Sequence, residues 1–411
     1  MRSLLLILIS SLALGNVPAQ PWDHVFENID TTNTIRLTSP EWNNTLIKNC
    51  TIHDTGNGND GIFLRDVRNV RIENCTIYNI DGQGGIRLSI SGNGTDSVVI
   101  IQNTIFDVQE NGINAPQRSQ NSPPLNQDHL QIIGNTIYNT GLGADNGLHH
   151  AIYCQAADFL IKDNTIFGIR DGNGISVRSS GIISGNVVSG SSKAEKSCIR
   201  YFSDHMTGNS DSLLIENNIL WNNVPNGHVL DIFDHAPLYT NSNGDSHVVK
   251  RFNIRFNTAV SLVTDAFALR ISDDYESPTY TLRADGNLLV NTATLANCAS
   301  VPGSIQAHAN LLKDNLDHFA SQTTPYDFHL NTMHQAVNFV GDSTANFPLV
   351  DIDGDMRNPA ELDAGADELV ISTGIAPRNI GEQFEVFPNP VGKDAQLTIQ
   401  SLSHIHTIQI L

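Results

Sequence analysis

Arginine side chains recur at equivalent places in a series of short, strand-like segments of this chain. A guanidinium group binds a carboxylate or a sulfate through two parallel hydrogen bonds, so a row of arginines suits an acidic polymer. Arginines on the outside of a sheet also pair with acidic neighbours, which is the alternative interpretation. The residues expected to contact a substrate on this outward face are Arg65, Arg87, Asn114, Gln155, Arg178, Arg200, Phe202 and Arg270.

Residues that could transfer protons gather around two of these arginines. Elimination at a uronate needs a cation to neutralise the carboxylate, a base for the neighbouring proton and an acid for the leaving oxygen. We expect Arg178 or Arg200 to neutralise the carboxylate. His150 or His149 is the expected base, and Tyr153 is the expected acid. Alternatively, the two adjacent histidines are ordinary turn or surface residues.

These side chains need a scaffold of stacked strands, and an internal repeat predicts one. The pattern apolar-x-x-Asn-x-apolar, as in residues 161–166, recurs ten times at intervals of 22 to 39 residues. A constant coil with connections of variable length produces such spacing. Asparagine suits a tight bend, where its amide can bond the equivalent residue one coil away. The column consists of Cys50, Cys75, Asn103, Asn135, Asn164, Asn186, Asn218, Asn257, Asn287 and Asn310.

Each repeat contains three short alternating runs, which indicate three β-strands. One run begins with a small residue and an isoleucine, as in Gly85–Leu88 and Gly174–Val177. Alternation turns the isoleucines inward and the arginines outward. We therefore predict an all-β fold, a right-handed parallel β-helix of about ten three-stranded coils. A register shift of one residue would reverse every side chain of a strand.

The repeats between residues 45 and 315 resemble those of right-handed parallel β-helix repeat proteins, the pectate-lyase-like superfamily. This resemblance implies a polysaccharide-active protein, and with the arginine row we expect a lyase that cleaves a uronate-containing polysaccharide by β-elimination. A non-catalytic, adhesin-like glycan-binding protein of the cell surface is the alternative. A glycoside hydrolase or a C5-epimerase is a third interpretation, for which the expected signature motifs are missing.

Both ends of the chain contain segments typical of export. Residues 1–19 combine an arginine, an apolar run and a small-residue cleavage site, which predicts a signal peptide. The parallel β-helix is expected over residues 20–345. Residues 346–369 resemble the closing segment of secreted Bacteroidetes-type β-helices and are expected to cap the last coil, and residues 370–383 form a linker. Residues 384–411, with Phe387-Pro388-Asn389-Pro390, resemble the first part of a sorting domain read by the Por-type secretion apparatus. We expect a secreted or surface-attached protein, exported through the periplasm.

Charge and composition limit the partners. The formal net charge of −20 disfavours nucleic acid, and no stretch is long enough to span a bilayer. The five widely spaced cysteines predict neither a disulfide framework nor a zinc site, and Cys50 and Cys75 are expected to fill the bend. The acidic run at residues 351–355 allows weak calcium binding, although no cofactor is required. The expected partners of this monomer are an acidic polysaccharide and the sorting machinery.

Overall fold

The computed structural model describes residues 22–89, 91–116, 127–143, 145–202, 212–233, 249–272, 280–301, 306–341, 347–369, 396–400 and 405–409. Two compact units are distinguished, Asp23–Ile371 and a second unit composed of residues 1–22 and 372–411. In the second unit the described strands are β35 (Gln396–Gln400) and β36 (Ile405–Gln409), which pair antiparallel. The predicted signal peptide and linker lie outside the described residues.

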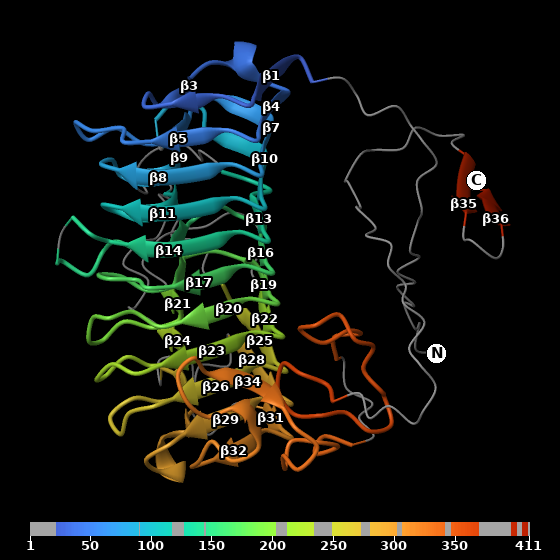
Figure 1. The fold of residues 1–411 in the computed structure, drawn as a ribbon. Coiled ribbons are helices and arrows are strands. Elements are labelled where there is room, and N and C mark those ends of the chain that lie inside the picture. The colour runs from blue at the N-terminus through green and yellow to red at the C-terminus, as the bar shows by residue number, and fades with distance from the viewer. Residues whose placement is uncertain are drawn as a thin grey trace. The chain divides into compact units, whose positions relative to one another are not determined.

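Unit Asp23–Ile371 is built from three parallel sheets, along which the chain coils (Figure 1). Sheet A consists of β1 (His24–Glu27), β4 (Thr45–Lys48), β7 (Val67–Glu73), β10 (Thr95–Ile101), β13 (Gln131–Ile133), β16 (Phe159–Lys162), β19 (Gly181–Ser184), β22 (Ser212–Glu216), β25 (Arg251–Arg255), β28 (Thr281–Asp285) and β31 (Gln306–His308). Sheet B consists of β2 (Asp30–Thr31), β5 (Thr51–His53), β8 (Thr76–Ile80), β11 (Thr104–Val108), β14 (Thr136–Thr140), β17 (Thr165–Phe167), β20 (Val187–Ser189), β23 (Ile219–Asn222), β26 (Thr258–Ser261), β29 (Leu288–Asn291) and β32 (Leu311–Lys313).

Sheet C carries the strands on which the candidate site residues were predicted. It consists of β3 (Ile35–Leu37), β6 (Ile62–Leu64), β9 (Gly84–Leu88), β12 (Asn111–Ala115), β15 (Ile152–Cys154), β18 (Ile175–Val177), β21 (Ile199–Phe202), β24 (Leu230–Phe233), β27 (Leu269–Ile271) and β30 (Ala299–Ser300). Short 3₁₀ turns occur at Pro40–Trp42 and Leu295–Asn297. None of the helices within the described ranges is long and apolar enough to cross a membrane.

The predicted fold and the predicted inward direction of the isoleucines are confirmed. On sheet C, Ile62 pairs with Ile86, and Ile86 pairs with Ile113. The same column continues through Ile152 and Ile175 in the following strands. All five side chains are completely buried, so each coil stacks isoleucine on isoleucine inside the helix. This stacking fixes the register that turns the intervening residues outward.

The predicted asparagine column forms a continuous hydrogen-bonded ladder at the bend between sheets A and B. From Asn103 to Asn287, each side-chain amide donates to the Oδ1 atom of the next asparagine over 2.8 to 3.0 Å, ending at Asn310. The first two positions hold Cys50 and Cys75. The backbone N–H of Cys75 donates to Asn103, and that of Cys50 donates to the Sγ atom of Cys75. The five cysteines of the chain are buried and free.

One coil of the helix precedes the first residue of the predicted bend column, Cys50. The coil formed by β1, β2 and β3 precedes Cys50 and pairs with the next coil in all three sheets. Its bend does not carry the motif, because Ile29 occupies the place that Cys50 and the later asparagines take in the following coils. The ten-residue bend column therefore omits the coil that contains Arg36, and the predicted count of about ten coils agrees with sheets of 10 and 11 strands.

The C-terminal part of the unit packs against the outward side of sheet B in the late coils, which we call the flank of the helix. The sequence instead predicts a cap on the last coil. The hairpin of β33 (Phe319–Ser321) and β34 (Asp327–Leu330) packs with outward residues of sheet B, where Phe328 contacts Trp221 at 5.5 Å between ring centres. Residues 347–369 continue along the bend between sheets A and B, where Arg357 bonds Asn217 and Glu368. The flank is covered because these late coils have apolar residues such as Val260 on their outward side.

Candidate functional site

The outward face of sheet C brings the predicted site residues into one column. Register pairs connect Phe63 with Arg87, Arg87 with Asn114 and Asn114 with Tyr153. The column then continues through Ser176, Arg200, Asp231 and Arg270. Neighbouring parallel strands lie about 4.8 Å apart, so a column of eight residues is roughly 34 Å long. This length is sufficient to contact several units of an extended polymer. Of the predicted site residues, this register aligns Arg87, Asn114, Tyr153, Arg200 and Arg270.

Arg178 is at the centre of a cluster of stacked side chains. Its guanidinium carbon lies 5.3 Å from the centre of the Tyr153 ring and 4.7 Å from that of Phe202. One of its amino groups, Nη1, donates to the hydroxyl of Ser176 over 2.9 Å. The side chain is 9% exposed, so the cation is held between two aromatic rings at the surface of the sheet.

His150 belongs to the same cluster, but in a state that does not suit a base. Its ring stacks on Tyr153 with 5.4 Å between ring centres, and its Nδ1 atom accepts the backbone N–H of Asn173 over 2.8 Å. Burial, followed by the charge of Arg178, holds the pKa of His150 well below its usual value. The neutral ring then carries its proton on Nε2, which makes that atom a hydrogen-bond donor.

The close approach to His150 depends on a glycine. A Cβ atom at Gly172 would lie 2.4 Å from the Nδ1 atom of His150 and 2.3 Å from the carbonyl oxygen of His149. No side chain fits there, so Gly172 allows the connection between β17 and β18 to approach the ring. The tautomer of His150 is therefore set by backbone from the next coil.

His149 turns away from this cluster toward the connection between sheets B and C. Its Nδ1 atom lies 3.3 Å from Asp171 and its Nε2 atom lies 3.9 Å from Glu110. Asp171 also accepts the backbone N–H groups of Gly147 and Leu148. Backbone hydrogen bonds and Lys193 outweigh the effect of burial and lower the pKa of Asp171. The two adjacent histidines thus occupy different environments, and only His150 lies beside Tyr153.

Arg200 and Arg270 share one buried carboxylate. The Nε atom of Arg200 donates to Asp231 over 2.7 Å, and Arg270 donates from Nε and Nη2 over 2.8 and 3.0 Å. Asp231 is completely buried, and both guanidinium groups also lie over the ring of Phe233. The three side chains come from the consecutive strands β21, β24 and β27. They form a cationic triad with one excess positive charge.

A second group of arginines lies at the N-terminal end of sheet C. Phe63 lies between Arg36 and Arg87, whose guanidinium carbons are 4.4 and 5.5 Å from its ring centre. Arg87 also approaches the buried Asp60 at 3.4 Å. Arg65 lies 3.7 Å from Asp66. Acidic neighbours therefore contact several arginines of the column, as the alternative interpretation of the sequence predicts.

Asn114 and Gln155, two polar residues that the sequence predicts to contact a substrate, are buried. Asn114 is 8% exposed and donates from Nδ2 to the carbonyl of Gln83 over 3.1 Å. Gln155 is 1% exposed, and its backbone N–H bonds the carbonyl of Ala115. Their burial leaves little side-chain surface for a substrate, whereas Tyr153 and Arg200 are only partly buried on the same face.

Lys196 is a candidate that the sequence reasoning missed. It lies three residues before Ile199, the first residue of β21, and its Nζ atom abuts Gly147, where a Cβ would lie 2.5 Å away. Burial, followed by the charge of Arg200, lowers the pKa of Lys196. Lys196 in turn contributes to the lowered pKa of His150. The strand repeat gives no signal for Lys196, because this residue lies outside a strand and its neighbours come from the connections of other coils.

Arg36 is also missed, although a signal exists. The segment Ile35-Arg36-Leu37 has the same apolar-Arg-apolar pattern as Ile86-Arg87-Leu88, and the two strands flank β6. A search for the strand pattern alone, without the asparagine of the bend, would have found it.

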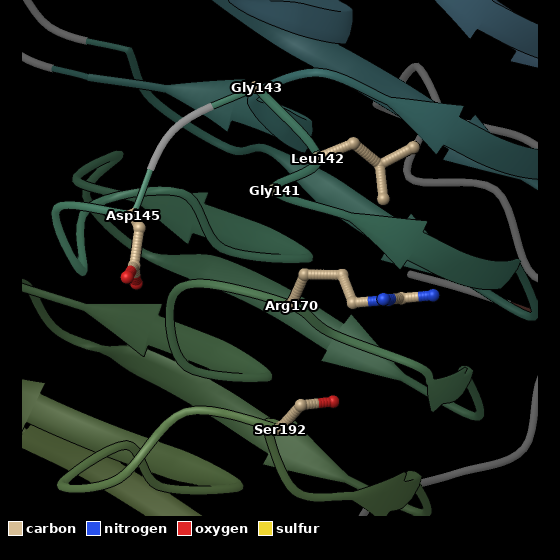
Figure 2. Close-up of a pocket in the computed structure, with 6 residues that line it drawn as sticks. All are labelled: Gly141, Leu142, Gly143, Asp145, Arg170 and Ser192. Carbon is tan, nitrogen blue, oxygen red and sulfur yellow. The ribbon is translucent and has the colours of Figure 1, made fainter.

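A shallow pocket of about 470 Å³ lies beside this face, on the connections from sheet B to sheet C (Figure 2). Its lining residues come from three successive connections and are Gly141, Leu142, Gly143, Asp145, Arg170 and Ser192. None of these is a predicted site residue. Asp145 pairs with Lys193 across the connections. The pocket and the stacked cluster are therefore separate features of adjacent surfaces.

The acidic segment places three carboxylates together. Oxygen atoms of Asp351, Asp353 and Asp367 lie within 4.8 Å of one another. Such a donor set is chemically suited to calcium. However, Asp351 already accepts three backbone N–H groups and Asp367 accepts that of Leu330, which accounts for their arrangement.

Comparisons with known proteins agree with the fold. The family described as "Right handed beta helix region" matches residues 23–122, and no curated protein matches the chain. The structure is similar to the crystal structure of pectate lyase Pel9A, with a TM-score of 0.52 and 10% sequence identity over 84% of this chain and 85% of that one. A PL6 family alginate lyase, AlyGC, gives a TM-score of 0.32 and 14% identity over 71% and 49% of the two chains, too weak a likeness for an argument. The chain is thus a right-handed parallel β-helix.

Proposed function

We propose that this protein binds an acidic, uronate-containing polysaccharide along the outward face of sheet C and cleaves it by β-elimination. The observation that carries the proposal is the cluster of Tyr153, His150 and Arg178, next to the arginines that Asp231 holds. An acidic chain of net charge −20 that concentrates arginines on one face gains local attraction for a polyanion. The likeness of the fold to a pectate lyase supports the same substrate class.

The proposed reaction divides the chemical roles among this cluster. Arg178 or Arg200 binds the uronate carboxylate and withdraws its charge, which acidifies the neighbouring C5–H bond. A base removes that proton, the electron pair forms the C4–C5 double bond, and the C4–O bond breaks. The Tyr153 hydroxyl donates its proton to the leaving oxygen. Stacking with His150 and Arg178 holds the tyrosine ring in place for this step.

Lys196 is the base that the surroundings of the cluster favour. A lowered pKa leaves a larger fraction of lysine unprotonated near neutral pH, whereas His150 already uses Nδ1 as an acceptor. The expected pH profile rises with pH on its acidic side as Lys196 loses its proton. In a Lys196→Ala variant we expect activity to fall and to recover in part when a primary amine is added.

The direct test is the absorbance of unsaturated uronate products. Protein from Gln20 onward is incubated with pectate, alginate, glycosaminoglycans and ulvan, with wild type compared to Arg178→Ala and Lys196→Ala. We expect wild type to form product from one polymer. Both variants are expected to lose this activity while they unfold at the same temperature as wild type. A flat trace on every polymer from folded wild type would contradict the lyase proposal. Wild-type rates in both variants would contradict the roles of Arg178 and Lys196.

A non-catalytic glycan-binding function is the second candidate, and a specific observation favours it. His150 is neutral and buried, and Asp60, Asp66 and Asp231 each contact arginines of the column. A binding protein needs only the cation and aromatic surfaces. Retention on immobilised acidic glycan without product release would support this candidate, and the absence of retention on any glycan would contradict it.

We also propose that the protein is exported. The support is the signal-peptide pattern of residues 1–19 and the Pro-Asn-Pro signature at residues 388–390. Expression of the full chain in a Bacteroidetes host, followed by N-terminal sequencing of the extracellular fraction, is expected to give a chain that starts at Gln20. Retention of the intact chain inside the cell would contradict export.

A further inference from the structure

We infer that Asp231 is a positioning residue that turns Arg200 and Arg270 into one clamp for a single oxyanion of the glycan, a carboxylate or a sulfate ester. This inference rests on the proposed function and specifies how the same face recognises its substrate. Asp231 occupies β24, between the strands that carry the two arginines. It accepts three hydrogen bonds from them over 2.7 to 3.0 Å.

The carboxylate of Asp231 is completely buried, and this burial makes it a rigid anchor. A buried carboxylate needs compensating charge and hydrogen bonds, which the two guanidinium groups supply. Both arginines also lie over the ring of Phe233, at 5.7 and 5.0 Å from its centre. The carboxylate and the ring together restrict the rotamers of two long side chains before any ligand arrives.

The arginines retain donors for a ligand. Arg200 uses Nε on Asp231, and Arg270 uses Nε and Nη2, so both amino groups of Arg200 and Nη1 of Arg270 donate to no atom in the described part of the chain. The side chains of Arg200 and Arg270 are 16% and 26% exposed. These donors form part of the surface of the column, next to Ser176 of the stacked cluster.

Charge indicates how many anionic groups the clamp takes. Two guanidinium groups face one carboxylate, so the triad has one unbalanced positive charge. One ligand oxyanion balances it, and a second would meet the negative charge of Asp231 nearby. The clamp therefore recognises one carboxylate or sulfate, while Arg178 serves the neighbouring coil.

The test compares two effects on affinity that have opposite signs, the gain from a less negative face and the loss from unpositioned arginines. Asp231→Asn removes a negative charge, so a purely electrostatic face would bind an acidic glycan more tightly. Loss of positioning predicts the reverse, and we expect binding of the preferred polymer to weaken about tenfold. Asp163→Asn is the matched control, because it changes net charge equally at an exposed site in the bend after β16, where Asp163 contacts Lys162. Tighter or unchanged binding by Asp231→Asn would overturn the inference.

A second variant covers a failure of Asp231→Asn to fold. Arg270→Lys keeps the charge but cannot give Asp231 two hydrogen bonds from a planar group. We expect it to weaken binding by a similar factor, and to raise KM more than it lowers kcat if the protein is a lyase. Wild-type affinity in this variant would also overturn the inference.

Two further measurements separate the clamp from the proposed function. Titration with inorganic sulfate, followed by NMR of arginine Nε–H groups, is expected to shift the signals of Arg200 and Arg270 in wild type, and no shift would overturn the clamp. Parallel titrations with pectate and a sulfated glycosaminoglycan identify which oxyanion it prefers. If Arg178→Ala abolishes glycan binding while Asp231→Asn does not, the proposed function holds and the clamp fails. Sulfate shifts without binding of any glycan would support the clamp and contradict the function.

Discussion

The guanidinium carbon of Arg178 lies 5.3 Å from the centre of the Tyr153 ring, although the two residues come from successive coils. The ring of Phe202, one coil further, covers the other side of the cation at 4.7 Å. This arrangement holds a positive charge against the ring of the proposed proton donor. The same stacking contacts thus position Arg178, the proposed binder of the carboxylate, and Tyr153, the proposed proton donor.

Replacing Arg178 by lysine tests the importance of the planar cation. Lysine keeps the charge but neither stacks between two rings nor offers a paired donor, so we expect affinity for the acidic glycan to fall about tenfold. Isothermal titration calorimetry with the preferred polymer measures the change. Arg68→Lys, at an exposed position of sheet A, is the matched control. Equal affinity in Arg178→Lys and wild type would contradict a role for the stacked guanidinium.

Replacing Tyr153 by phenylalanine separates proton transfer from binding. The ring and its contacts with Arg178 and His150 are retained, and only the hydroxyl is lost. We expect kcat for elimination to fall by about 10²- to 10⁴-fold, while glycan affinity changes less than about twofold. Initial rates of product absorbance and calorimetry measure the two effects. Undiminished kcat would exclude Tyr153 as the acid.

Replacing Asn186 by alanine tests the asparagine ladder. The Asn186 amide donates to Ile161, Ser184 and Asn218, and its Oδ1 atom accepts from Asn164, all inside the helix. Leaving these buried groups unsatisfied is expected to lower the free energy of unfolding by roughly 2–5 kcal/mol. Urea denaturation measures the change, with the exposed Asn33→Ala as control. A change as small as that of the control would show that the ladder contributes little stability.

The closing segment is expected to lose stability as pH rises through about 6. Burial raises the pKa of Asp363 to about 6, above the usual value of an unfolded aspartate. The folded state then binds the proton more tightly, so its stabilising effect is complete below about pH 4 and is lost by about pH 6. The size of this effect is on the order of 2–3 kcal/mol.

Asp363→Asn removes this titration. Thermal unfolding of both proteins between pH 4 and pH 7 is expected to give a smaller pH dependence for the variant. Parallel pH profiles of the variant and wild type would contradict a raised pKa for Asp363.

Local periodicity in the sequence is sufficient to predict the scaffold and the face of the site. Ile86 and Arg87 alternate within one strand, so their directions follow from the pleat alone. Asn103 and Asn135 mark the bends, because a motif repeated in every coil must stack on itself. These features depend on residues within a single repeat, which a single sequence displays.

Contacts between different coils limit what the sequence can predict about the site. Asp231 is visible as an outward residue, but its sharing between Arg200 and Arg270 depends on side-chain directions across three strands. His149 and His150 are adjacent in sequence, yet Asp171 and Asn173 of the next coil hold them in different environments. The flank covered by the C-terminal hairpin likewise depends on packing against distant coils.

The direction of the asparagine ladder makes the coil a unit of evolutionary change. Every asparagine from Asn135 to Asn287 donates to its successor and accepts from its predecessor by the same geometry, so one coil is interchangeable with another at this bend. Duplicating or deleting a whole coil preserves each bond of the ladder. It also lengthens or shortens the outward column of sheet C by one residue, or about 4.8 Å. The reach of this protein along a polymer can therefore evolve in whole-coil steps, without redesign of its core.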